Sequence, residues 1–241
     1  MNIKTTIKYY VNPDLLEKSS ILDSINYIAN KYRKRLTNKK LLDIGCGSKP
    51  YKQSFKQLGI TYEGIDFENF SVNYSFKRTA PDYYFSKNYL NDFKLSQFND
   101  DSYDIVTAFQ VLEHHENIDM FFSETCRILK QGGYLLISFP FIWELHEEPN
   151  DFQRLTHYKI KKLCITHGLR MKEVVKRGST LSVISQLLNL SLKNMHLKPF
   201  IKNCIYFGLF CPLQTFSSFY DKQSQNLRRK IFLGYTILII K

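Results

Sequence analysis

The chain lacks the cysteine patterns that stabilise small secreted domains or hold structural zinc. Its five cysteines are an odd number and include no Cys-x-x-Cys pair. A disulfide framework and a zinc site both use cysteines at characteristic paired spacings, so the sequence favours neither. We therefore expect free thiols and a reducing, cytoplasmic setting.

The chain also lacks a long apolar run. No stretch reaches the roughly 18 consecutive apolar residues that a membrane-spanning helix needs. The opening sequence, MNIKTTIKYY, contains no apolar signal-peptide core. These absences predict a cytoplasmic protein, with peripheral contact at the inner face of the membrane left open.

Acidic residues are scarce relative to basic ones. The 241 residues include 34 lysines and arginines against 22 aspartates and glutamates, which gives a net charge of +12. Such a charge favours an anionic partner, whether nucleic acid, a phosphorylated metabolite or a membrane surface. The length and the 44% content of hydrophobic residues indicate one globular domain with additions.

Residues 41–50, LLDIGCGSKP, predict the nucleotide-binding corner of a Rossmann-type sheet. A buried strand ends at Gly45 and Gly47, and a short helix at 51–58 follows Pro50. The Walker spacing is absent, and Pro50 stands where a dinucleotide fingerprint has its third glycine. What remains is Asp-x-Gly-x-Gly. The acid at the strand end, Asp43, disfavours a pyrophosphate and suits a cationic ligand that carries an amino acid.

The motif from Asp43 to Gly47 resembles the first motif of the class I S-adenosylmethionine-dependent methyltransferases. A second expected strand, 62–66, ends in Asp66, which lies 19 residues beyond Gly47. In Rossmann-type folds an acid about 20 residues past the glycine turn meets the two ribose hydroxyls of the ligand. The two motifs together are therefore more informative than either alone.

Further matches to this family follow in chain order up to residue 140. The pair Asp92-Phe93 is similar to the segment at the adenine ring, residues 110–115 resemble a leucine-glutamate-histidine turn, and residues 127–133 resemble the motif before the fifth strand. The resemblance implies S-adenosylmethionine as the cofactor, with Asp92 accepting from the adenine amino group. The cofactor-binding residues that it implies are Asp43, Gly45, Cys46, Gly47, Asp66, Phe67, Asp92, Phe93 and Gln110.

The resemblance also implies the fold. We expect a seven-stranded Rossmann-like methyltransferase sheet, mostly parallel with one antiparallel strand, with helices on both faces. Further strands are expected at 82–86, 103–109, 134–140, 169–176 and 231–240, and helices at 12–36, 118–130 and 156–167. The expected parts are an N-terminal helical segment at 1–38, the methyltransferase domain at 39–178 and 230–241, and a helical insert at 179–229.

The insert before the last strand is apolar and basic. Leu181, Ile184, Leu187 and Leu188 recur at helical spacing, and an apolar run at 204–211 is flanked by lysines and arginines. Aromatic, apolar and basic residues together suit a membrane interface or a lipid-linked substrate, which predicts membrane contact through residues 180–220. A helical lid over the substrate cleft and a dimer contact are the alternatives.

Methyl transfer to a hydroxyl also needs a base that takes its proton. Histidine has the right pKa for this role near neutrality, and His146 lies in the loop where this fold holds its acceptor. His114 is the second catalytic candidate. The other titratable side chains past the fourth and fifth strands are His115, Glu147 and Asp151.

A metal site is not expected. Some methyltransferases bind Mg²⁺ through a Glu-x-x-Glu-His turn with a later histidine, but Gln110 replaces the first carboxylate here. The loss of that charge weakens the site for a hard cation. The three remaining residues, Glu113, His114 and His146, are too few to argue for a metal.

The acceptor is inferred from a loop. Residues 146–156 resemble a loop of bacterial methyltransferases found with cell-surface polysaccharide enzymes, which implies O-methylation of a sugar on a surface glycan or its lipid-linked precursor. A quinone or other small-lipid acceptor is the alternative within the same chemistry. RNA methylation is disfavoured because the basic residues are scattered without an added RNA-binding module. A non-enzymatic S-adenosylmethionine-binding protein is the remaining alternative.

Overall fold

The computed structural model describes residues 15–67, 79–85, 93–223 and 230–241. The chain divides into two compact units. We call Ser24–Val175 with Tyr235–Lys241 the sheet unit, and Met1–Asp23 with Lys176–Gly234 the helical unit. The domain boundaries expected from the sequence, after residues 38, 178 and 229, remain predictions.

A seven-stranded sheet forms the centre of the fold, in the order β3-β2-β1-β4-β5-β7-β6. The neighbours from β3 to β5 pair in parallel. Lys241, which follows β7, exchanges backbone hydrogen bonds with Gly132 and Gly133 near the start of β5, so β7 runs antiparallel. The mostly parallel sheet expected from the sequence is thereby confirmed. The strands are β1 (Lys40–Ile44), β2 (Thr61–Asp66), β3 (Tyr83–Tyr84), β4 (Tyr103–Phe109), β5 (Leu129–Pro140), β6 (Arg170–Arg177) and β7 (Gly234–Ile240).

The middle strands are buried on both faces. Leu41, Leu42 and Ile44 of β1 and the apolar residues of β4 are almost wholly excluded from solvent. Such continuous apolar runs are typical of parallel strands covered by helices on both sides. The register places Asp43 opposite Thr107, so two polar side chains meet inside this apolar layer.

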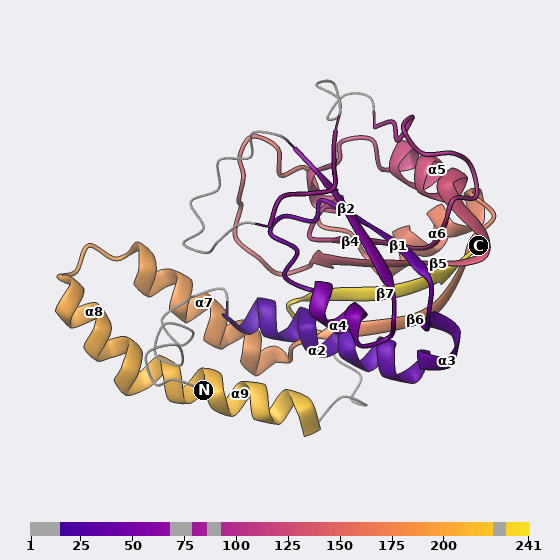
Figure 1. The fold of residues 1–241 in the computed structure, drawn as a ribbon. Coiled ribbons are helices and arrows are strands. Elements are labelled where there is room, and N and C mark those ends of the chain that lie inside the picture. Colours follow the sequence, from indigo (N-terminus) through magenta and orange to yellow (C-terminus); the bar gives the residue numbers. More distant parts are fainter. Residues whose placement is uncertain (1–14, 68–78, 86–92, 224–229) are drawn as a thin grey trace. The chain divides into compact units, whose positions relative to one another are not determined.

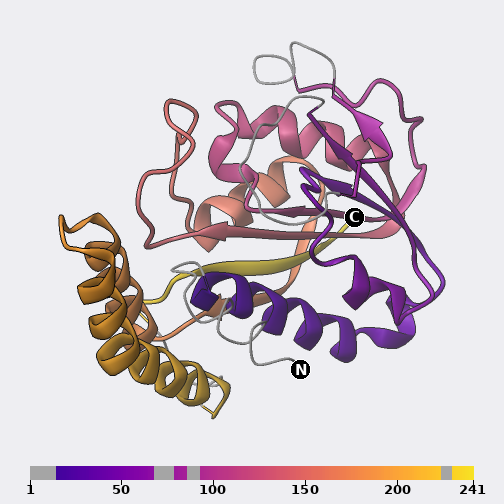
Figure 2. The same cartoon turned by 60° about the vertical axis from the view of Figure 1, so that its left-hand side comes forward.

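Helices cover both faces of the sheet. α3 (Arg33–Leu36) and α4 (Lys52–Lys56) lie on one face, and α5 (Ile118–Ile128) and α6 (His157–Thr166) lie on the other (Figures 1 and 2). The Thr156 side chain accepts from the Lys159 N–H and so caps α6. The single helix expected at 12–36 is divided at Tyr32 into α2 (Leu15–Lys31) and α3, and residues 12–14 lie outside the described part.

The boundary between α5 and β5 differs from expectation. The helix was expected to reach residue 130, but it ends at Ile128 and Leu129 is already extended. The N–H groups of Asp101 and Ser102 donate to the carbonyls of Arg127 and Ile128, and Leu129 pairs with Tyr103. Pairing with β4 therefore ends the helix at Ile128, before the two glycines that were expected to end it.

The helical unit contains α7 (Thr180–Asn194), α8 (Pro199–Ile205), the π-helical turn η2 (Tyr206–Phe210) and α9 (Cys211–Gln223). α7 and α9 pack against each other. The apolar positions Ile184, Leu187 and Leu188, whose spacing predicted a helix, are exposed. Among the helices of the described residues, we find none with both the length and the apolar character needed to cross a bilayer.

Candidate active site

The glycine turn after β1 forms one half of the candidate site. Gly45 and Gly47 both have positive φ, at 66° and 51°. A Cβ on Gly45 would lie 2.5 Å from Cγ2 of Val111, so the close approach of the two segments requires glycine there. A Cβ on Gly47 would meet no described atom within 4 Å. The turn is therefore packed on one side and open on the other, where a ligand has room.

Asp66 joins this turn to the tip of β2. Its carboxylate accepts hydrogen bonds from the N–H of Gly47 at 2.5 Å and from the N–H of Phe67 at 2.8 Å. Two backbone donors fix the carboxylate beside the open face of the turn. The structure thus brings Gly45, Gly47, Asp66 and Phe67 together, and their role in cofactor binding stays a prediction.

Asp43 lies beneath the turn rather than at its surface. Its side chain is 2% exposed and accepts from Thr107 Oγ1 at 2.6 Å and from the Tyr62 hydroxyl. Burial raises the pKa of Asp43 to about 7, although both hydrogen bonds act in the opposite direction. Asp43 is therefore held inside the protein by the neighbouring strands, and its contact with the cofactor stays a prediction.

Sequence reasoning missed the two residues that hold Asp43. Thr107 is a polar residue within the apolar run of β4, and this interruption was a visible signal. The register of β1 with β4 places it opposite Asp43, which no single-strand pattern could show. Tyr62 carried no comparable signal, because a tyrosine in a strand is common.

The other predicted cofactor-binding residues occupy several environments. Cys46 is buried, and burial raises the pKa of its thiol, so it is not a nucleophile. Phe93 packs edge-on against His115 at 4.8 Å between ring centroids. Gln110 has a φ of 57° and donates from Nε2 to Ser138 Oγ at 3.1 Å. Asp92 lies outside the described residues.

A histidine pair forms the other half of the site. His114 lies in the short turn η1 (Leu112–His114) after β4, and His146 lies in the loop after β5. Their ring centroids are 4.9 Å apart. His114 Nδ1 lies 2.8 Å from the Asn150 carbonyl oxygen, and His146 Nδ1 lies 3.2 Å from Asp151 Oδ2. Both partners are acceptors, so each Nδ1 carries the proton and each Nε2 has a lone pair in the neutral ring.

Arg154 and Asp151 hold the loop that carries His146. Arg154 donates to both oxygens of Asp151, at 2.5 and 2.7 Å, and to the Glu144 carbonyl at 3.1 Å. The hydrogen bonds from Arg154 lower the pKa of Asp151 to about 2. Asp151 is therefore ionised at neutral pH, and it orients His146 rather than acting as a base itself.

His115 is excluded as a base by its surroundings. Burial lowers the pKa of its imidazole to about 4, and the ring packs against Phe93 and Phe121. Its neighbour His114 is only partly buried. Among the histidines near the carboxyl ends of β4 and β5, His114 and His146 are therefore the two available for chemistry.

The two halves meet at one edge of the sheet. The glycine turn follows β1, and Val111, which packs against Gly45, directly precedes the turn that carries His114. Open parallel sheets bind ligands at the carboxyl ends of their strands. The glycine turn and the histidine pair therefore lie at the edge of the sheet where ligands bind in this kind of fold.

Comparisons with known proteins agree with this geometry. Residues 42–137 match the family described as a methyltransferase domain. A solved structure of a SAM-dependent methyltransferase from Archaeoglobus fulgidus superposes with a TM-score of 0.53 at 14% identity, over 91% of this chain and 94% of that one. The chain has the fold of the S-adenosylmethionine-dependent methyltransferases.

Two further comparisons limit what the methyltransferase fold implies. The [4+2]-cyclase SpnF superposes with a TM-score of 0.51 at 15% identity, over 90% of this chain and 80% of that one. The fold alone therefore does not fix the reaction. The ubiquinone biosynthesis O-methyltransferase of Pelagibacter ubique is 29% identical over 110 residues, which are 44% of this chain and 43% of that protein. The chain thus spans less than half the length of this curated relative.

Proposed function

We propose that this chain is an S-adenosylmethionine-dependent methyltransferase that methylates a hydroxyl group. The observation that carries the proposal is Asp66, fixed by the Gly47 N–H beside the open face of the glycine turn. The space that a Cβ at Gly47 would fill is available to the cofactor. The ribose hydroxyls would donate to Asp66, with Phe67 beside them and with Asp92, Phe93 and Gln110 completing the nucleoside side.

The histidine pair supplies the acid–base chemistry of the proposal. When bound, the cofactor offers a methyl group on a positively charged sulfur, and the new oxygen–carbon bond forms as the carbon–sulfur bond breaks with its electron pair left on sulfur. His146 Nε2 takes the proton of the acceptor hydroxyl, and Asp151 stabilises the resulting imidazolium through Nδ1. General-base help of this kind contributes about 10²–10⁴-fold. His114 borders the same space and orients the acceptor.

A lipid-borne hydroxyl is the acceptor that we propose. The loop after β5 resembles those of polysaccharide-associated methyltransferases, which supports a sugar of a surface glycan or of its lipid-linked precursor. The relative named for ubiquinone biosynthesis supports a phenolic quinone precursor instead. Both acceptors are hydroxyls delivered on a long apolar chain, and the phenol has the stronger support from the comparisons.

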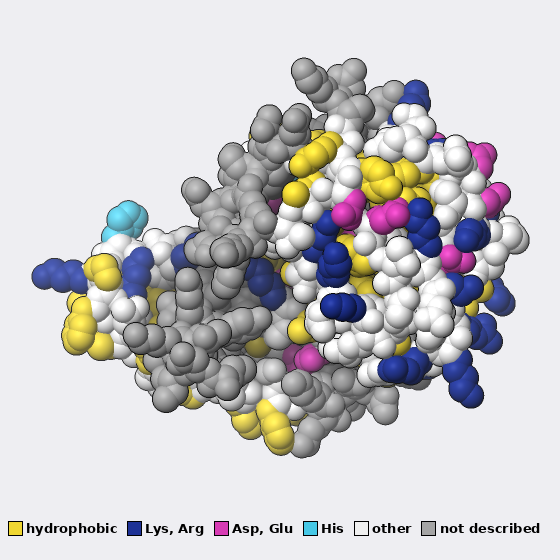
Figure 3. All heavy atoms as spheres, in the orientation of Figure 1, with side chains coloured by type: hydrophobic (Ala, Val, Ile, Leu, Met, Phe, Trp, Pro, Cys, Tyr) yellow, Lys and Arg dark blue, Asp and Glu magenta, His cyan; other side chains and the backbone are white. Residues whose placement is uncertain are grey.

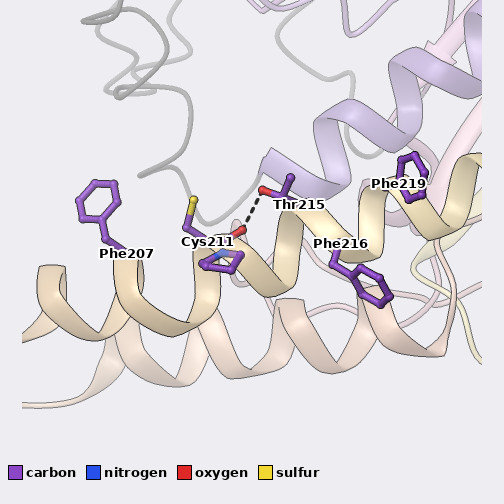
Figure 4. A pocket seen from close by; sticks show the side chains of 6 residues that line it. Phe207, Cys211, Thr215, Phe216 and Phe219 are labelled. Carbon is purple, nitrogen blue, oxygen red and sulfur yellow. Dashed lines mark hydrogen bonds between the residues drawn. The ribbon is translucent and has the colours of Figure 1, made fainter.

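The helical unit supports contact with a membrane. Residues 178–220 contain Lys193, Lys198 and Lys202 but no aspartate or glutamate. Phe216 and Phe219 are 59% and 60% exposed, and with Phe207 they line an open groove along η2 and α9 (Figure 4). Figure 3 shows hydrophobic side chains beside lysines over α8. Exposed aromatics in a segment rich in lysine suit the headgroup region of anionic lipids, so we propose peripheral binding at such a surface.

Calorimetry with S-adenosylhomocysteine tests the cofactor assignment. Asp66→Ala removes the two proposed ribose hydrogen bonds, each worth about 1.5–3 kcal/mol with a charged acceptor, so affinity should fall at least about 100-fold. Asp100→Ala is the matched control, because this exposed acid forms an ion pair with Arg127 at the surface, away from the glycine turn. Equal affinity of both variants, or no heat with the unmodified protein, would contradict the assignment.

Turnover with two acceptors tests the reaction. Labelled S-adenosylmethionine should transfer its methyl group to a polyprenyl phenol in detergent, and less or not at all to a polyprenyl-linked glycan. His146→Ala should lower kcat about 10²–10⁴-fold while cofactor affinity stays the same. If the glycan alone is methylated, the phenolic acceptor is wrong. If His146→Ala turns over normally, His146 is not the base.

A further inference from the structure

The loop after β5 and the turn after β4 bring two imidazoles and a carboxylate to one point. One ligand atom from each of Glu113, His114 and His146 lies within 4.8 Å of the others. His146 Nε2 is 3.9 Å from Glu113 Oε1. The turn and the loop are tied together by Gln153, whose Nε2 donates to the carbonyls of Leu112 and His115. The cluster is therefore built from two segments that are fixed against each other.

The orientation of both rings is the one found in metal sites. His114 Nδ1 donates to the Asn150 carbonyl, and His146 Nδ1 faces the Asp151 carboxylate. Histidines that bind metals usually donate their other N–H to a carbonyl or a carboxylate, which fixes the ring and makes the ligating nitrogen more basic. Both Nε2 lone pairs are then left for the shared space.

We propose that Glu113, His114 and His146 bind one divalent first-row transition ion, with Zn²⁺ or Mn²⁺ as the examples. Two nitrogen ligands favour such an ion over Mg²⁺ or Ca²⁺, which prefer oxygen. Bond lengths of about 2.1 Å separate ligand atoms in a tetrahedral site by about 3.4 Å. In the structure the three ligand atoms lie within 4.8 Å of one another, so a bound ion would draw them closer together.

The buried carboxylate supports the same assignment. Glu113 is 1% exposed, and its backbone carbonyl accepts from the Phe152 N–H, which holds the residue in place. Buried carboxylates are found in ion pairs or on metals, because the bare charge is costly to desolvate. The exposed Glu147, whose Oε2 lies 3.7 Å from His114 Nε2, lies at the rim of the cluster.

A site with three protein ligands keeps a position for a substrate oxygen. There the ion would lower the pKa of a coordinated hydroxyl, and this would replace the base role of His146, since one Nε2 lone pair cannot serve both. This catalytic consequence rests on the proposed function. Metal binding itself does not rest on it.

Cobalt titration of the chelator-treated full chain tests the site. Co²⁺ bound to two histidines and a carboxylate absorbs visible light, so the unmodified protein should show a band that saturates at one equivalent. His114→Ala, His146→Ala and Glu113→Gln should each abolish it, whereas His196→Ala, at an exposed histidine of the helical unit, should leave it unchanged. Mg²⁺ in excess should not displace the cobalt. No band with the unmodified protein, or an unchanged band in both histidine variants, would overturn the proposal.

Two further variants separate loss of the metal from loss of the fold or of the cofactor site. Asp151→Asn keeps the three ligands but weakens the support of His146, so Co²⁺ affinity should fall about 10–100-fold. Circular dichroism and a rise in Tm on adding Zn²⁺ show whether each variant still folds and binds. Asp66→Ala should lose cofactor affinity but keep the cobalt band. Loss of both in a folded Asp66→Ala would count against an independent metal site.

Discussion

The two units of this chain place polar and apolar groups in opposite ways. In the sheet unit the interior is apolar, and a polar group such as Asp43 is buried with donors arranged around it. In the helical unit many polar side chains also lie inside, beside a small apolar cluster of Leu192, Tyr206 and Phe210. Ser182, Ser185, Gln186 and Asn189 form a buried stripe on α7, and Gln214 and Ser217 form another on α9.

The outer surface of the helical unit shows the reverse pattern. Phe200 is 77% exposed, and most of the large apolar side chains that the described residues expose belong to this unit. A helix pair with a polar seam and an apolar outside does not match the usual amphipathic pattern of a surface helix in water. The sheet unit is thus arranged around its site, whereas the exposed apolar side chains of the helical unit fit the membrane contact that we propose.

The largest expected effect concerns the apolar outside of the helical unit. Phe216→Ser with Phe219→Ser should weaken binding to vesicles that contain phosphatidylglycerol by about 100-fold or more, because burying each phenylalanine is worth about 1.5–3 kcal/mol and the two contributions add. Co-sedimentation measures this. The matched control is Tyr158→Ser with Ile165→Ser on α6 of the sheet unit. These two side chains are at least as exposed as Phe216 and Phe219. If both double variants lost vesicle affinity equally, the helical unit would not be the part of the chain that binds the membrane.

The next effect concerns the buried acid of the sheet unit. Because burial raises the pKa of Asp43 to about 7, the folded protein binds more protons than the unfolded chain between about pH 4 and 7. Stability contributed by the protonated group is therefore lost as the pH rises through this window. Between pH 5 and pH 8 the unmodified protein should lose about 3 kcal/mol relative to Asp43→Asn. Chemical denaturation of both proteins at pH 5 and pH 8 measures the change, and a constant difference would contradict the raised pKa.

A smaller effect is expected at a donor to this acid. Thr107→Val removes the hydrogen bond to buried Asp43, which should cost about 1–3 kcal/mol of unfolding free energy. Thr125→Val is the control, because Thr125 is equally buried but donates to carbonyls of its own helix, those of Phe121 and Phe122. Its loss should be about 1 kcal/mol or less. If both substitutions lower the unfolding free energy equally, the hydrogen bond from Thr107 to Asp43 is no stronger than a bond to a neutral carbonyl.

The parts of the site that sequence could predict are the local ones. Asp43, Gly45 and Gly47 follow one another, and their order alone predicts a strand, a turn and an acid. Asp66 was found through its spacing. By contrast, the meeting of His114 with His146 depends on how two separate loops end beside β4 and β5. The residue type identified both histidines as candidates for catalysis. No spacing in the sequence could show that their rings meet beside Glu113.

The helical unit shows a different limit of sequence reasoning. The polar stripe of α7 and its apolar stripe both recur at three and four residues, so periodicity identified the helix correctly. Periodicity does not say which stripe faces inward. In this helix the polar stripe is the buried one, and Ile184 and Leu187 are exposed.

The smallest expected effect tests this polar seam directly. Asn189 is buried, and its Nδ2 makes no hydrogen bond within the described residues. Asn189→Leu removes the cost of burying that amide at similar volume, so the unfolding free energy should rise by about 1 kcal/mol. Asn194→Leu, at an exposed position of the same helix, should change it by no more than about 0.5 kcal/mol. If Asn189→Leu instead lowered the unfolding free energy, the amide of Asn189 would stabilise the packing of α7. The buried polar side chains would then hold the helical unit together.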